Sequence, residues 1–79
     1  FGGAYYNLGY IYGELNNYEQ SIYFYNKAVQ QNFDLEATLV NLALQEIKAN
    51  KKASACAHLE EAYQLGRTDI KPLMNKYCK

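Results

Sequence analysis

Few side chains in this 79-residue chain could carry out chemistry, and they are scattered. Cys56 and Cys78 are its two thiols, and His58 is its single imidazole. The spacing of the cysteines matches no metal site and is too sparse for a disulfide framework, so we expect two free thiols. His58 has neither a second histidine nor a nucleophile motif beside it. We therefore expect it on the surface or between helices rather than as a general base.

Acidic side chains offer no better basis for catalysis. Glu60 and Glu61 are adjacent on one predicted helix, and we expect them on its solvent-exposed face. Glu46 is a charged residue in an otherwise apolar pattern, and we attach no function to it. The chain contains no glycine-rich phosphate loop, metal cluster or nucleophile–base pair. The sequence therefore predicts a protein that is not an enzyme and needs no cofactor.

The charge balance excludes two further classes of partner. Lysine and arginine total 8, aspartate and glutamate total 8, and the net charge is zero. Nucleic acids and anionic membranes require a cationic surface, so we expect neither as a partner. No segment approaches the roughly 20 apolar residues of a membrane span. The chain begins at Phe1 rather than methionine, so we expect it to be part of a longer protein. Its compartment is therefore left open, with the cytoplasm favoured.

Side chains suited to binding are more regular. Asn7, Asn41 and Asn75 recur at intervals of 34 residues, and each amide could pair with the backbone of an extended peptide. The chain also has nine tyrosines, a residue type that supplies large contact area at low entropy cost. We expect most of them to fill the core and Tyr6 and Tyr10 to be interface anchors.

Helical periodicity runs through the whole chain and determines where these side chains lie. We predict helices over residues 3–15, 17–31, 34–50, 52–65 and 69–79. Asn16 is suited to the left-handed turn that ends a helix, and Gly66 is a glycine at the usual C-terminal cap position. Asn17 and Asp34 are predicted N-caps, and Pro72 is tolerated in a first turn. Helices of this length with short turns pack as antiparallel neighbours.

A 34-residue shift superimposes the chain on itself without a gap. Gly9 then meets Ala43, and Tyr25 meets Leu59. A helix–turn–helix period of this length resembles the tetratricopeptide repeat. The first repeat carries the family pattern at Tyr5, Leu8, Gly9, Tyr12, Ser21, Tyr25 and Ala28. The second carries Leu39, Leu42, Ala43, Ala55, Leu59 and Ala62, but has Glu46 where an aromatic is expected.

This resemblance implies an all-α, right-handed superhelix of two antiparallel helix pairs and a C-terminal capping helix. We expect one domain over 1–79, with repeats at about 2–34 and 35–68 and a cap at about 69–79 that ends at or near the natural C-terminus. Small residues should lie where helices cross. The large residues that should fill the wedges between helices are Tyr5, Leu8, Tyr12, Phe24 and Tyr25.

The resemblance also implies that the first helix of each pair lines a concave groove. The residues expected to contact a partner there are Tyr6, Asn7, Tyr10, Val40, Asn41, Leu44, Ile47, Lys71 and Asn75. The segment 39–44 is apolar nearly all round, so its second face needs a cover. Either a ligand covers it, or Tyr6 and Tyr10 lie over Val40 and Leu44. The asparagines likewise either contact a peptide or only orient neighbouring turns.

The expected function is protein–protein interaction, through a peptide or protein segment held in this partly apolar groove. The alternative is an architectural role, in which the repeats stack on further repeats or on a second copy. Some family members instead grip a partner's terminal carboxylate with lysine, asparagine and arginine. Asn41 and Lys71 fall at two of those places, but Tyr6, Tyr10 and Asn75 occupy the others, so we do not expect that mode.

Overall fold

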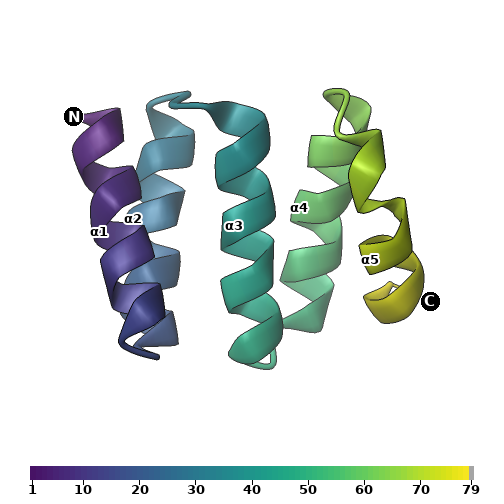
Figure 1. The fold of residues 1–79 in the computed structure, drawn as a ribbon, viewed down its shortest axis with the longest axis horizontal. Coiled ribbons are helices and arrows are strands. Elements are labelled where there is room, and N and C mark those ends of the chain that lie inside the picture. The colour runs from purple at the N-terminus through teal and green to yellow at the C-terminus, as the bar shows by residue number, and fades with distance from the viewer. Residues whose placement is uncertain (79) are drawn as a thin grey trace.

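The computed structural model describes residues 1–78, which form five α-helices and a 3-10 turn (Figure 1). The helices are α1 (Gly2–Glu14), α2 (Tyr18–Gln30), α3 (Leu35–Lys48) and α4 (Lys52–Gln64), and the turn η1 (Thr68–Ile70) leads into α5 (Lys71–Tyr77). They lie side by side in chain order as antiparallel pairs, which confirms the predicted fold class. The handedness of the superhelix stays a prediction, and the end of the cap at residue 79 lies outside the described residues.

Helix boundaries follow the predicted turn chemistry. Asn16 and Asn50 adopt left-handed backbone angles, with φ of 59° and 65°, two residues past the last residues of α1 and α3. Gly66 does the same after α4, with φ of 112°, a value that side-chain-bearing residues rarely adopt. The Asn17 side chain accepts a hydrogen bond from the backbone N–H of Gln20 at 3.4 Å and so caps α2. The predictions for Asn16, Asn17 and Gly66 are confirmed.

The predicted cap at Asp34 is only partly correct. Asp34 occupies the N-cap position of α3, but its side chain makes no capping bond. Its φ of 40° is left-handed, whereas a capping residue normally has β-region angles that place its oxygen over the first turn. A different side chain secures this turn, because Thr38 Oγ1 donates to the Phe33 carbonyl at 2.7 Å.

The first helix pair is held at a close crossing around Gly9. A Cβ added there would lie 2.7 Å from the Tyr25 ring, so only glycine permits this approach of α1 to α2. Ser21, on α2 and fully buried, donates its hydroxyl to the Gly9 carbonyl at 2.6 Å. The buried hydroxyl is thereby satisfied, and the small residues predicted at the crossing are confirmed.

Aromatic rings fill the wedge beside this crossing, as predicted. The Phe24 ring stacks on Tyr12 with centroids 5.6 Å apart and on Tyr5 at 6.3 Å. Leu8, however, was wrongly predicted to fill a wedge. It is 36% exposed.

The second helix pair contains the larger buried cluster. Its fully buried members are Leu39, Ala43, Ala55, Leu59 and Ala62. Stacking of the two pairs buries Leu42 of α3 against Ile22 and Tyr25 of α2. Each pair therefore completes its core by packing on its neighbour, as repeat architectures require.

Cys56 and Cys78 form a disulfide, so the prediction of two free thiols is wrong. Cys56 lies on α4 and Cys78 directly follows α5, and their Cα atoms are 5.6 Å apart. The 22-residue separation gave no indication of this proximity, which arises because α5 folds back along α4. Disulfides persist in oxidising environments, so this pairing favours an oxidising compartment over the cytoplasm.

Replacing Gly9 with alanine should lower stability. The added methyl would meet the buried Tyr25 ring, and overpacking of this kind costs about 1–3 kcal/mol. The better helix propensity of alanine offsets about 1 kcal/mol of that. In Gly3→Ala, the matched control, the new Cβ meets only the Phe33 ring at 3.5 Å, an ordinary contact. Urea unfolding should show Gly9→Ala less stable than wild type and Gly3→Ala equal or more stable. Equal stability of the two variants would contradict the crossing.

Reduction of the disulfide should loosen α5. This helix has only seven residues and no fully buried side chain, and it contacts the core through the partly buried Leu73 and Met74. The disulfide joins cysteines 22 residues apart. Constraining a loop of this length in the unfolded chain stabilises the folded state by about 3 kcal/mol, by the chain-entropy estimate. Amide exchange in residues 71–77 should therefore accelerate in dithiothreitol, while exchange in α1 and α2 stays unchanged. A Cys56→Ser variant should exchange fast with or without reductant. Slow exchange of α5 after complete reduction would count against the tether.

Candidate functional site

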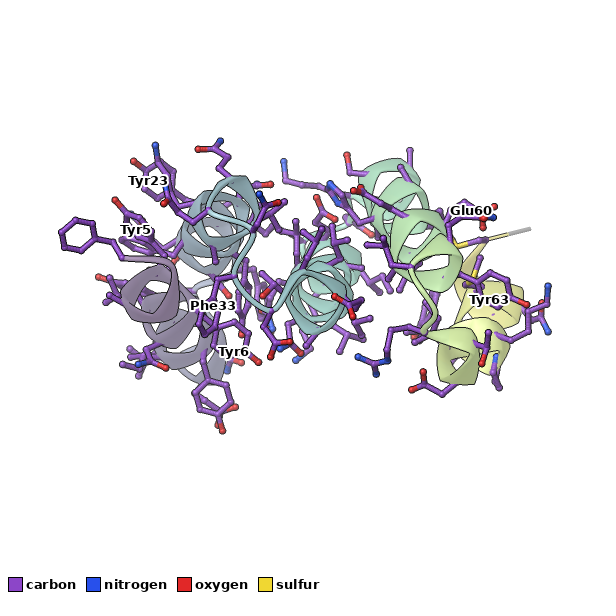
Figure 2. All side chains as sticks on the ribbon, turned by 90° about the horizontal axis from the view of Figure 1, so that it is seen from above. Tyr5, Tyr6, Tyr23, Phe33, Glu60 and Tyr63 are labelled. Atoms are coloured by element: carbon purple, nitrogen blue, oxygen red, sulfur yellow. A yellow bond between two sulfur atoms is a disulfide. The ribbon has the colours of Figure 1, made fainter. Side chains whose placement is uncertain are left out.

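The predicted groove residues of α1 lie on one side of the molecule. Tyr6 and Tyr10 are four residues apart and so share a face of the helix. Figure 2 shows Tyr6 on the opposite side of the row of helices from Tyr23, which α2 supplies. The two helices thus present tyrosines to opposite faces of the protein.

Tyr6 joins the first helix pair to the second. Its ring packs edge-on against Tyr25 at 5.6 Å and against Phe33 at 5.5 Å. Its hydroxyl accepts a hydrogen bond from Asn41 Nδ2 of α3 at 2.7 Å. Both side chains are partly buried, so this contact orients the face and leaves less of either side chain for a ligand.

Tyr10 is the open part of the face. It is 56% exposed, although it lies one turn from the packed Tyr6 ring. Asn7, between them in sequence, is also exposed. Tyrosine is among the residue types that are enriched at interface cores.

The predicted contacts on α3 differ in exposure. Val40 is buried in the core of the second pair and cannot touch a ligand without rearrangement. Leu44 and Ile47 pack on the same cluster but remain partly exposed. The face is therefore covered at Val40 and open toward Tyr10.

The C-terminal contacts are polar and exposed. Lys71 places its Nζ 5.3 Å above the Tyr63 ring, and Asn75 is exposed one turn further along α5. Of the three asparagines at 34-residue spacing, Asn7 and Asn75 are thus exposed, whereas Asn41 is bonded to Tyr6.

A buried ion pair between α3 and α4 was missed at the sequence level. Glu46 Oε1 lies 2.7 Å from His58 Nδ1, and Glu46 is only 3% exposed. The hydrogen bond from Glu46 raises the pKa of His58, against the opposing effect of burial. The signal was present, because Glu46 and His58 are the 34-residue equivalents of Tyr12 and Phe24, which stack in the first pair.

Tyr25 is also electrostatically perturbed, for a structural reason. Burial against α1, with smaller effects from Tyr6, Tyr10 and Glu14, raises its pKa to about 12. A phenol held this firmly neutral is a packing residue and not a proton donor at neutral pH.

Other features of the described chain add no predicted contact to this face. A hollow lies beside the disulfide, lined by Lys52, Ala53, Cys56, Tyr77 and Cys78, none of which is a predicted site residue. Residues 1–78 contain no cluster of three or more histidine, cysteine or acidic side chains placed to hold a metal. Within the same range, no helix has the length and apolarity needed to cross a membrane.

Paired antiparallel helices with small residues at their crossings define a helical-repeat protein. Comparison with family models identifies the repeat, since residues 3–34 match the model described as "Tetratricopeptide repeat". The α1–α2 pair is therefore a tetratricopeptide repeat, which confirms the resemblance drawn from the residues. No curated protein and no solved structure gave a significant match. Tetratricopeptide repeats are typically non-catalytic and bind proteins, so the chain is classed as a protein-interaction module.

Protonation of His58 should make stability depend on pH. Its pKa is higher in the folded chain than its usual 6.5, so the folded state holds the proton more tightly than the unfolded one. The stabilisation is complete below pH 6.5 and is lost as pH rises through the folded-state pKa. Thermal unfolding from pH 6 upward should show stability falling in wild type, with a smaller slope in His58→Ala. An equal slope in both would contradict this role.

Proposed function

We propose that the chain binds an apolar or aromatic peptide segment along the face formed by α1 and α3. The exposure of Tyr10 is the observation that carries this proposal, because an open tyrosine ring offers a partner a large contact area at low entropy cost. Leu44 occupies the equivalent position on α3, 34 residues later, and it is partly exposed as well. Together they offer two apolar contacts in matching positions of successive repeats.

The chemistry of this face favours an uncharged ligand. Its α1 side chains are tyrosines and an asparagine, and its α3 side chains are one asparagine and three aliphatic residues. Asn7 and Asn75 are exposed and could pair with a peptide backbone, while Lys71 is the one cation among the predicted contacts. A segment with aromatic or aliphatic anchors, helical or extended, suits these surfaces better than an acidic tail.

An architectural role is the second candidate function. Leu8, Ile11 and Leu15 are spaced three and four residues apart along α1 and its C-cap, and all three are exposed. Exposed apolar stripes of this kind mark protein contacts. This surface is distinct from the groove, so both roles could coexist in one molecule.

Binding at the groove can be tested with a displayed library of random dodecapeptides. We expect enrichment of peptides with aromatic or aliphatic anchors, and we expect Tyr10→Ser to weaken their affinity at least tenfold, since loss of a buried anchor costs about 2 kcal/mol or more. Titration of the selected peptides by fluorescence anisotropy measures the change. Because Tyr10 is largely exposed, its replacement should leave the fold intact.

Tyr23→Ser provides the matched control. Tyr23 is 53% exposed, close to the value for Tyr10, but it lies on the opposite face. Its replacement should leave peptide affinity unchanged. Failure to enrich any peptide, or equal losses in the two variants, would reject the groove as the binding site.

A further inference from the structure

The hollow beside the disulfide opens onto both of its cysteines. Cys56 and Cys78 line it together with Lys52, Ala53 and Tyr77, and both cysteines are partly exposed. Its volume is about 440 Å³, within the roughly 300–1,000 Å³ of small-molecule sites. A disulfide that small molecules can approach is able to exchange with a thiol, through attack of a thiolate on one of the two sulfurs.

The charges around the hollow are positive. Lys52 is the charged residue among those that line it. Lys76 lies nearby, with its Nζ 5.2 Å from the ring centroid of Tyr77, another lining residue. Glu60 follows Cys56 by four residues on α4, but it does not line the hollow. The hollow therefore favours a thiol that also carries an anionic group such as a carboxylate or sulfonate.

The two sulfurs differ in how well they hold a negative charge. Lys52 precedes Cys56 by four residues, so the two share a face of α4, and both line the hollow. A cation beside a sulfur stabilises its thiolate. Cys78 follows the last residue of α5, where the carbonyl end of the helix opposes negative charge. Because the sulfur that forms the more stable thiolate leaves more readily, Cys56 is the leaving group and Cys78 is attacked.

The disulfide also takes the place of an apolar contact between helices. Leu42 of α3 is fully buried against Ile22 of α2. Thirty-four residues later these two positions are Lys76 of α5 and Cys56 of α4, and Lys76 is exposed. The contact that fixes α3 on α2 is thus replaced, between α5 and α4, by a lysine and a covalent bond. Opening that bond removes the main restraint on α5.

We propose that the hollow is an exchange site for a small anionic thiol, which attacks Cys78 and thereby releases α5 from α4. The incoming thiolate forms an S–S bond to Cys78, the bond between the two cysteines breaks, and its electron pair leaves with Cys56 as a thiolate. One thiolate is consumed and one is formed, so the step needs no other oxidant or reductant. The hollow shares no residue with the proposed peptide-binding face, and neither proposal depends on the other.

Reaction rates with three thiols of different charge test the site. The probes are mercaptoethanesulfonate, mercaptoethanol and cysteamine, which are anionic, neutral and cationic, and each rate is divided by the concentration of thiolate. Lys52→Gln should lower the ratio of the sulfonate rate to the cysteamine rate by about fivefold or more at low salt, the effect of two unit charges about 4 Å apart in water. Lys27→Gln, a control that removes an equal charge from α2, should leave this ratio unchanged. An unchanged ratio in Lys52→Gln would overturn the preference for an anionic thiol.

The position of the adduct tests the direction of attack. After brief reaction with mercaptoethanesulfonate, N-ethylmaleimide blocks the released thiol, and mass spectrometry locates both groups in tryptic peptides. Cys56 and Cys78 fall in different peptides, because Arg67 lies between them. We expect the sulfonate on Cys78 and the maleimide on Cys56. The reverse arrangement would overturn the assigned direction, and reaction in urea alone, with none in the folded chain, would overturn the site itself.

Hydrogen exchange in residues 71–77 tests the release of α5. These amides should exchange fast in the adduct with mercaptoethanesulfonate and slowly in the untreated chain. Lys76→Leu gives α5 the side chain that Leu42 supplies in α3, so the adduct of this variant should keep slow exchange. Slow exchange in the wild-type adduct would overturn the release of α5. Equally fast exchange in the two adducts would overturn the argument that the disulfide replaces an apolar contact.

Discussion

The close approach of α1 to α2 at Gly9 is the contact on which the rest of the structure depends. The Tyr25 ring fills the space that a side chain at position 9 would occupy, and Ser21 closes the crossing with a hydrogen bond to the Gly9 carbonyl. Because Tyr25 is fixed there, it can also support Leu42 of α3 and the edge of Tyr6. One crossing thus sets the spacing within the first pair and its stacking on the second.

The second pair meets the same geometric requirement with other residues. Ala43 stands at the position of Gly9, and Leu59 stands at the position of Tyr25. The larger alanine on the first helix of the pair is thus accompanied by a smaller residue, leucine in place of tyrosine, on the second. Glu46 and His58 replace the stacked Tyr12 and Phe24, so a dispersion contact at 5.6 Å becomes a hydrogen-bonded ion pair at 2.7 Å. Residues that contact each other in one repeat are therefore replaced together in the other. This is expected where the volume between the helices stays the same while the type of contact that fills it differs.

The fold could be predicted from the sequence because its determinants are local or periodic. The left-handed turn at Asn16 and the cap at Asn17 depend on a few neighbouring residues. What could not be predicted depends on neighbours in space. The 22-residue separation of Cys56 and Cys78 did not reveal that α5 brings them together, and the repeat spacing aligned Glu46 and His58 without showing that they would bond. For the candidate site, the sequence proposed a face and left open which of its residues would be covered; Val40 is buried and Tyr10 is exposed.

A double-mutant cycle at Gly9 and Tyr25 tests the central crossing most directly. Tyr25→Leu combined with Gly9→Ala would give the first pair the alanine–leucine combination that Ala43 and Leu59 have in the second. Unfolding free energies of wild type, both single variants and the double variant yield the coupling between the two positions. We predict that alanine at position 9 is less destabilising, by more than about 0.5 kcal/mol, when the ring is absent. Strictly additive effects would contradict the account.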